Sequence, residues 1–226
     1  AGPEQNLNAS IEEVEYSLVS GIRKLRRDFG QRIGFLEGHG ELQDIEVADL
    51  AGSLSEYFET ERVKIDGKIT SLASRVEDST GYKVINRFDL LVIASPDSLF
   101  SEKDKYVLDQ FVMYGGKILW LIDAVTAEID SLAYSNEVMA LMKNLNLTDL
   151  LFKYGVRVNP NVVQDIQCAM VPVNTALAGQ QPQFEPVPWV YFPLLSPVAG
   201  HPITRNLNLV KGQFVSVLDT VGEDPA

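Results

Sequence analysis

The sequence has 226 residues, of which 46% are hydrophobic and 22% charged, values typical of a globular protein that buries a sizeable core. Its 31 Asp and Glu side chains outnumber its 19 Lys and Arg side chains, so the formal net charge is −12. This charge disfavours binding to nucleic acid or docking on anionic lipid, because both need clustered cations.

We expect residues 1–29 to form a lead-in helix. Ser10 and Glu13 have the spacing of a capping box, and Gly30 is a suitable stop. The chain begins Ala-Gly-Pro without a methionine and contains no apolar run near the roughly 18 residues of a membrane span. Because it also ends in the polar sequence Gly-Glu-Asp-Pro-Ala, we expect it to be a soluble piece excised from a longer protein.

The next segment reads as alternating strands and helices. The apolar run Arg32–Leu36 predicts a first strand, Asp49 is expected to cap a helix up to Phe58, and Arg62–Ile65 predicts a second strand. The loop Glu37-Gly-His-Gly-Glu41 follows the first predicted strand. It can turn sharply because it contains two glycines, and glycine tolerates positive φ. We expect Tyr82–Ile85 to be a short edge strand.

Residues 88–123 predict a strand, a helix and a parallel strand. Leu90–Ala94 and Ile118–Ile122 are short apolar runs that suit buried strands. Between them, Ser101 with Asp104 three residues later is the pattern of a helix N-cap, and Gly115-Gly116 ends the helix. This strand, helix and strand are therefore predicted to form a right-handed βαβ crossover.

The composition of the sequence changes after Asp123. A short helix is expected over Asp149–Tyr154, capped by Asn146 or Thr148. Proline and β-branched residues then dominate, and four strands are predicted at Val162-Val163, Ala169–Val173, Trp189–Phe192 and Phe214–Leu218. The prediction is thus an α/β core over residues 30–123, an open and mainly parallel sheet flanked by helices. A β-rich, loop-rich C-terminal extension over residues 124–226 is expected to pack on the same sheet as one structural unit.

Ligands of open parallel sheets bind outside the carboxyl ends of the strands. The segments expected there offer six polar candidates for a binding site: Glu37, His39, Glu41, Ser95, Asp97 and Asp123. They could contact a ligand or a protein partner.

Each candidate also has a simpler structural explanation. His39 could be a general base or a metal ligand, but turn chemistry between two glycines is favoured, and no set of metal ligands is evident. Ser95 and Asp97 are best explained by the turn Ser-Pro-Asp, and Asp123 by a cap. The lone cysteine, Cys168, lacks a nearby histidine and is expected to be inert.

Other binding chemistry has weak support in the sequence. Gly38-x-Gly40 lacks the third glycine and the lysine of phosphate-binding loops, so no cofactor is predicted. Trp189 and Tyr191 could form an aromatic binding ledge, although core or interface packing explains them equally well. The acidic chain is expected to bind no nucleic acid.

Several motifs together resemble the gliding-motility auxiliary proteins of GldG type. They are FLEGHGEL (35–42), FSEKDKYVLDQFVMYGGKILWLID (100–123), LNLTDLLFKYGVRVNPNVVQD (145–165), PWVYFPLL (188–195) and HPITRNLN (201–208). The central half is also similar to the broader domain of auxiliary proteins of uncharacterised ABC transport systems. That resemblance implies a flavodoxin-like or glutamine-amidotransferase-like α/β sheet, related to an intraflagellar-transport domain.

The resemblance implies a membrane-anchored subunit that works with an ABC-transporter ATPase and permease. Its soluble region would lie on the extracytoplasmic, periplasmic face of the cytoplasmic membrane, held by flanking helices absent from this piece. It implies no catalytic residues, and the expected elbow positions hold Ser95 or Asp123 rather than a nucleophilic cysteine.

We therefore expect a non-catalytic domain that acts by protein–protein interaction or ligand sensing. A first alternative is a small-molecule binder, for instance of carbohydrate, using His39 and its loop with Trp189 and Tyr191. A second is an amidotransferase-like or hydrolase-like enzyme whose nucleophile the sequence does not identify.

Overall fold

The computed structural model describes residues 14, 17–19, 21–22, 30–78, 81–127, 140–174, 176, 181, 183–198, 200–201, 204 and 207–222. The chain divides into two compact units, Ala1–Ile122 and Asp123–Ala226. Of the predicted lead-in helix, the described positions 14, 17–19, 21 and 22 are helical, and the rest of it lies outside the described residues.

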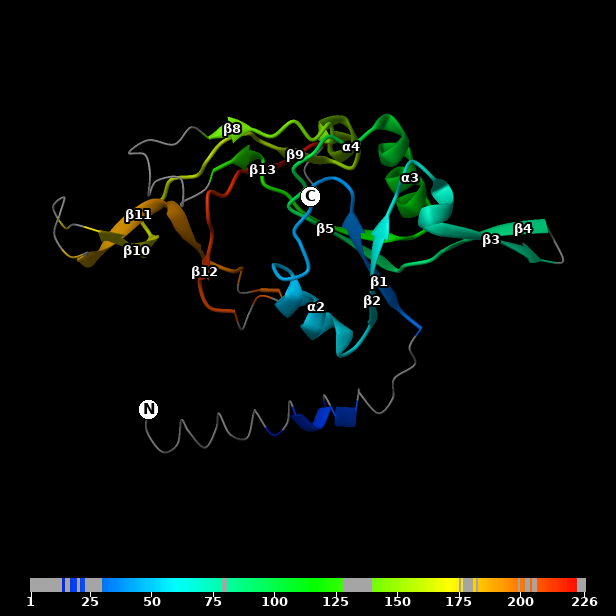
Figure 1. Cartoon of the computed structure of the whole chain (residues 1–226), viewed down its shortest axis with the longest axis horizontal. Helices are drawn as coiled ribbons and strands as arrows, with labels where there is room; N and C mark the ends of the chain where they lie inside the picture. Colours follow the sequence, from blue (N-terminus) through cyan, green and yellow to red (C-terminus); the bar gives the residue numbers. More distant parts are fainter. Residues whose placement is uncertain are drawn as a thin grey trace. The chain divides into compact units, whose positions relative to one another are not determined.

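The first unit is built on a four-stranded sheet in which every pairing is parallel, with the order β2-β1-β5-β6 (Figure 1). Its elements in chain order are β1 (Arg32–Glu37), α2 (Ala48–Ser55), β2 (Glu59–Lys64), the 3-10 helix η1 (Ile69–Ser71), β3 (Ala73–Asp78), β4 (Gly81–Asn86), β5 (Leu90–Ala94), α3 (Glu102–Met113) and β6 (Lys117–Leu121). The predicted parallel sheet is confirmed, as is the unit of β5, α3 and β6.

The central strands β1 and β5 are buried on both faces, as the middle of a parallel sheet should be, whereas the edge strands β2 and β6 are partly exposed. On one face Ile33 and Phe35 of β1 join Val92 of β5 in a buried cluster, and Leu54 of α2 packs against it. Helix α3 lies on the other side of the strands (Figure 1) and buries Leu108. These contacts explain why β1 and β5 read as continuous apolar runs.

Gly34 of β1 is required by the tight packing of the second face. A Cβ placed there would lie 2.8 Å from Leu91 Cδ2 and 3.2 Å from the ring of Phe88. Both neighbours are fully buried. A larger side chain at this position would have to displace them.

Helix α2 begins differently from the prediction. Val47 occupies the N-cap position without a side-chain hydrogen bond, so the prediction of an Asp49 cap is wrong. Val47 is instead buried in the cluster between α2 and the sheet, and this packing sets where the helix starts. Asp49 lies in the first turn, where a carboxylate interacts favourably with the helix dipole.

The predicted edge strand Tyr82–Ile85 is not part of the parallel sheet. It lies in β4, which pairs antiparallel with β3 from Ala73↔Asn86 onward and forms a hairpin that extends from the sheet (Figure 1). Arg75 of β3 lies over the ring of Tyr82, 4.7 Å from its centroid. Because the two strands satisfy each other's backbone groups, β4 needs no place beside β2 or β6.

The second unit contains small antiparallel sheets and one short helix. Its elements are β7 (Val125–Thr126), β8 (Leu141–Met142), α4 (Thr148–Lys153), β9 (Val156–Val158), β10 (Cys168–Asn174), β11 (Phe184–Leu195), β12 (Val210–Lys211) and β13 (Leu218–Thr220). The pairings are β7 with β8, β9 with β13, and β10-β11-β12. In the described part of the chain, these strands pair with one another and not with the parallel sheet. The expected packing of residues 124–226 on that sheet stays a prediction.

Local predictions in this unit were partly wrong. Strands β10 and β11 contain the two predicted runs that begin at Ala169 and Trp189, but Val162-Val163 lies outside any strand. Phe214 has a φ of +48°, which turns the chain, and β13 starts only at Leu218. The N-cap of α4 is Leu147 without a side-chain hydrogen bond, because Asn146 has a left-handed φ of +57° and the helix starts only after Leu147.

Candidate functional site at the end of β1

The order β2-β1-β5-β6 places a topological switch point between β1 and β5. From β1 the chain runs to β2 on one side, and the next strand of the sheet, β5, lies on the other side of β1. Loops at such a point part to leave a crevice, and ligands bind there. In this chain the loops after β1 and β5 are instead in contact, because the carbonyl oxygen of His39 accepts the N–H groups of Asp97 at 2.9 Å and Ser98 at 2.7 Å.

Two glycines shape the loop after β1, as the sequence predicted. Gly38 has a φ of +120° and Gly40 a φ of +75°, both in the region that favours glycine. A Cβ on Gly40 would also lie 3.1 Å from the Cβ of Asp97. The turn and the close approach of the two loops both depend on these positions.

The ring of His39 is held inside the loop cluster by three side chains. The residue is 7% exposed, and its imidazole stacks on Phe100 with a centroid separation of 3.8 Å and an interplanar angle of 6°. Its Nε2 lies 3.4 Å from Asp104 Oδ2, and its Nδ1 lies 3.3 Å from Glu41 Oε1. The other oxygen of Glu41 accepts the backbone N–H of His39 at 2.7 Å. The ring therefore faces two carboxylates rather than the backbone groups that a simple turn would offer.

Asp104 reaches this cluster through the helix cap that the sequence predicted. The Ser101 hydroxyl caps α3 by accepting the N–H of Asp104 at 3.2 Å, and it donates to Asp104 Oδ2 at 2.6 Å. Asp104 Oδ1 accepts the N–H of Gly67 at 2.9 Å. One carboxylate thus joins α3, the loop after β2 and the loop after β1. The sequence indicated its capping role but gave no signal that it would face His39.

All three charged groups of the cluster are shifted toward their ionised forms. Burial alone would lower the pKa of His39, but the carboxylates of Glu41 and Asp104 raise it above its usual value. Burial opposes ionisation of Glu41 as well, yet the nearby His39 ring and the backbone N–H of His39 lower its pKa. The pKa of Asp104 is lowered in the same way, against burial, by Ser101, His39 and Gly67. These directions mean that the fold favours the charged form of each group over the neutral one.

Two open cavities flank the carboxyl end of β1 and share Glu37 and Gly38. The larger, of about 520 Å³, is lined by Glu37, Gly38, Gly40, Glu41, Gln43, Asp44, Ile45, Arg62 and Lys64. The smaller, of about 250 Å³, is lined by Glu37, Gly38, His39, Asp66, Gly67, Ser101, Lys103 and Asp104. Both are large enough for a small polar ligand or a protruding side chain of a partner.

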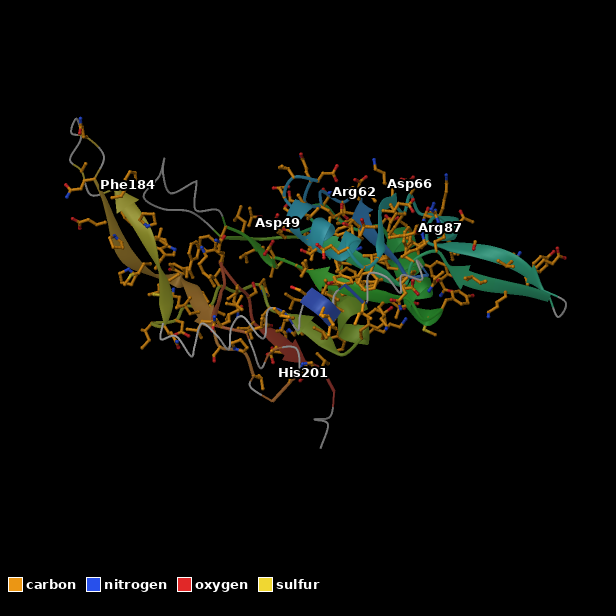
Figure 2. All side chains as sticks on the ribbon, turned by 90° about the horizontal axis from the view of Figure 1, so that it is seen from below. Asp49, Arg62, Asp66, Arg87, Phe184 and His201 are labelled. Carbon is orange, nitrogen blue, oxygen red and sulfur yellow. The ribbon has the colours of Figure 1, made fainter. Side chains whose placement is uncertain are left out.

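Arg62 of β2 organises the larger cavity, and the sequence gave no indication of this role. Its guanidinium donates to Glu37 at 3.0 Å and to the carbonyl oxygen of Leu42 at 3.1 Å, and it forms an ion pair with Asp44. Figure 2 shows Arg62 and Asp66 at the same end of the unit. The Arg62 contacts hold the chain between β1 and α2 against the edge of the sheet.

The structure brings together only part of the predicted set. Glu37, His39 and Glu41 line the cavities. Ser95 and Asp97 follow β5, where the N–H of Ser95 donates to the carbonyl oxygen of Leu121 at 2.7 Å, and neither belongs to the two linings. The remaining three predicted residues belong to the second unit: Asp123, Trp189 and Tyr191.

Among the residues that the structure describes, no group of three or more His, Cys, Asp or Glu side chains is arranged to hold a metal ion. The described helices include none with both the length and the apolar character needed to cross a bilayer.

Trp189 and Tyr191 lie near each other on β11, with ring centroids 6.0 Å apart at a tilt of 56°.

Comparison with known proteins identifies the family. No curated protein matches this sequence. The fold is similar to a solved structure described as the mmIFT52 N-terminal domain, with a TM-score of 0.51 at 16% sequence identity, covering 86% of this chain and 70% of that chain. The likeness at that identity concerns the fold alone. A sequence profile of a family described as "ABC-type uncharacterized transport system" matches residues 30–226. The chain therefore belongs to this family of ABC-transporter auxiliary proteins.

Proposed function

We propose that this chain is a non-catalytic domain of an ABC-transporter complex that works outside the cytoplasmic membrane, by binding another subunit or by sensing a ligand. Membership of the auxiliary family supports the transporter context. The GldG-type motifs of the sequence favour a system linked to gliding motility, with an ATPase and a permease as partners. They also favour anchoring by membrane helices outside this piece.

The observation that carries the proposal is the closed ion-pair cluster around His39. A general base needs an imidazole nitrogen that can reach a substrate proton. Here Nδ1 faces Glu41 and Nε2 faces Asp104, and the ring is buried against Phe100. This arrangement favours a structural role, in which His39 joins the loops that frame the two cavities.

The larger cavity is the surface through which the domain is proposed to recognise its ligand or partner. Lys64 and Ile45 line it together with the Arg62 ion pairs. Ile45 is 83% exposed, and an apolar side chain of this size beside charged groups suits a protein contact. Lys64 offers a cation for an acidic group of the ligand or partner.

One observation favours the enzyme alternative. Ser95 directly follows β5 and has a φ of +46°, a conformation that costs energy for a residue with a Cβ. Nucleophiles of α/β enzymes occupy sharp turns of this kind after a strand. A hydrolase or amidotransferase would require the Ser95 hydroxyl to react. Loss of a hydrolytic activity in Ser95→Ala, with unchanged stability, would establish that alternative.

The proposed contact can be tested by photocrosslinking in membranes that contain the full-length protein and its transporter. A photoreactive amino acid at Ile45 should crosslink to the permease and not to the ATPase, because the domain is proposed to lie on the opposite side of the membrane from the ATPase. The matched control places the same amino acid at Ile69, which is exposed on η1 and outside the larger cavity. Equal crosslinking from both positions, or none from Ile45, would contradict the proposed surface.

Ligand sensing can be tested separately by thermal shift with sugars, amino acids and nucleotides. A ligand present at 100 times its dissociation constant stabilises the folded state by about 2.7 kcal/mol. A sensed ligand should lose this shift in Lys64→Ala. If no ligand shifts the wild-type protein, the sensing half of the proposal fails and the protein contact remains.

A further inference from the structure

Strand β6 has an outer edge with unpaired backbone groups. The N–H of Lys117 donates to the carbonyl oxygen of Asp89 at 3.0 Å, and the carbonyl oxygen of Leu121 accepts the N–H of Ser95 at 2.7 Å. The odd-numbered residues of β6 therefore bond toward β5, and the even-numbered residues point their N–H and C=O groups to the other side. These are Ile118, Trp120 and, just beyond the strand, Ile122. In the part of the chain that the structure describes, no strand pairs with this edge.

The two edges of the sheet differ in their protection against added strands. The other edge strand, β2, carries four charged side chains within six residues, and such charges discourage edge-to-edge pairing. Residues 118–122, in contrast, contain no charged residue, proline or glycine. Leu119 and Leu121 are 40% and 43% exposed on one face of β6. An apolar edge of this kind is a template for strand addition.

The sequence of this edge reads the same in both directions. Residues 118–122 are Ile-Leu-Trp-Leu-Ile, with Lys117 before them and Asp123 after them. The alternation of exposed and half-buried side chains that starts in β6 continues through Ile122 to Asp123, before the bend at Ala124. The edge is therefore a palindrome flanked by opposite charges. Antiparallel pairing with an identical strand would match it residue for residue.

We propose that two copies of this chain pair through β6, antiparallel, around a two-fold axis at Trp120. In this register the outward backbone groups of Trp120 meet those of Trp120 in the second copy, and those of Ile118 meet those of Ile122. Leu119 lies opposite Leu121 on the same face, which covers both exposed side chains. A two-fold interface has to be complementary to itself, and this edge meets that condition.

The flanking charges indicate a second copy rather than a strand of another protein. In the proposed register Lys117 lies opposite Asp123 of the second copy, and the symmetry repeats this pair at the other end of the interface. A strand of unrelated sequence could bond to the same backbone groups, but it would match neither the palindrome nor both charges. The net charge of −12 on each copy opposes the dimer. This repulsion is largely screened beyond about 8 Å at physiological ionic strength, whereas the two ion pairs are local.

The dimer is independent of the function proposed above. The larger cavity borders β2, at the opposite edge of the sheet from β6. Pairing through β6 would therefore leave that cavity accessible in both copies. It would also join the two four-stranded sheets into one continuous sheet.

The test is the oligomeric state of the 226-residue chain, measured by sedimentation velocity at increasing protein concentration. Wild type should form a reversible dimer. Lys117→Asp and Asp123→Lys should each raise the dissociation constant of the dimer about ten-fold or more, because each creates two pairs of like charges. The double variant restores opposite charges and should dimerise as wild type does. The two single variants change the net charge in opposite directions, so overall repulsion cannot explain a loss in both.

The matched control is Lys83→Asp on β4, which is also exposed and changes the net charge by the same amount as Lys117→Asp. It should dimerise as wild type does, and circular dichroism should show that all variants are folded. A wild-type chain that stays monomeric at every concentration would overturn the proposal. Equal weakening by the control, or a double variant no better than the single variants, would also overturn it.

Disulfide formation tests the register, in a Cys168→Ser background that removes the native thiol. A mixture of Leu119→Cys and Leu121→Cys chains should form a crosslinked dimer, because these positions face each other with Cα atoms about 4.5 Å apart. Leu119→Cys alone should crosslink much less, because its two copies would be diagonal neighbours about 7–8 Å apart. Equal crosslinking by the mixture and by Leu119→Cys alone would refute pairing around Trp120.

Discussion

Replacing His39 with alanine should destabilise the first unit by about 3 kcal/mol. Loss of the stack on Phe100 costs about 0.5–1.5 kcal/mol. Removing one partner of a buried ion pair costs about 3–5 kcal/mol, but this part is reduced because both carboxylates keep other donors. Glu41 keeps the backbone N–H of residue 39, and Asp104 keeps Ser101.

The measurement is urea unfolding followed by the fluorescence of one tryptophan. In a Trp189→Phe background, Trp120 on β6 is the sole tryptophan and reports on the first unit. The double variant His39→Ala with Glu41→Gln should lose less stability than the sum of the single variants, by about 0.5–3 kcal/mol, because contacting residues are coupled. The exposed His201→Ala is the control and should change the unfolding free energy by less than about 0.5 kcal/mol.

The pH dependence gives the refuting result. The folded pKa of His39 is raised, so its stabilisation is fully present below its ordinary pKa of 6.5 and is lost as pH rises through the folded pKa. The folded pKa values of Glu41 and Asp104 are lowered, so their stabilisation is present above 4.5 and 3.8 and is lost as pH falls through the folded pKa values. Wild type should therefore lose stability above pH 6.5 more steeply than His39→Ala. Equal slopes, or strict additivity in the double variant, would refute the ion-pair cluster.

Two further predictions concern packing and capping in the same unit. Gly34→Ala should lower the free energy of unfolding by about 1–3 kcal/mol, because the added Cβ would meet Leu91 and Phe88. Gly52→Ala in α2, where no atom lies within 4 Å of the added Cβ, should raise it by about 0.5–1 kcal/mol. Similar melting temperatures for the two variants would contradict this. Ser101→Ala should cost about 0.5–2 kcal/mol through loss of the α3 cap. Ser101→Thr should recover most of this loss in the same thermal melts, because it keeps a hydroxyl that can accept from and donate to Asp104. Equal melting temperatures for Ser101→Ala and wild type would contradict the capping role.

The sequence allowed β5, α3 and β6 to be predicted because their signals are local. Apolar runs, a capping serine and a terminal glycine pair all act within a few residues. The loop around His39 could be selected as a candidate site for the same reason, since two glycines flank this residue in the sequence. Its partner Asp104 could not be identified, because only the fold brings α3 to the end of β1. The spacing of 65 residues between these two side chains carries no periodic signal.

The errors lie where pairing decides the structure. Strand β4 was detected, but its neighbour was not, because an apolar pattern specifies a face and not a partner strand. The same holds for the second unit, whose short strands form separate sheets. Val47 shows a related limit, since a buried contact rather than a polar cap sets the start of α2.

The position of β1 in the middle of the sheet also has consequences for synthesis of the chain. β1 can pair with β2 soon after both leave the ribosome, but its other edge waits for β5, as in the bond from the Arg32 N–H to Asp89, 57 residues later. At about 5–20 residues per second, the wait is roughly 3–11 s. The inserted β3–β4 hairpin lengthens this interval. During it a nascent chain exposes an apolar strand edge, so slow translation of residues 66–94 should favour chaperone binding or aggregation.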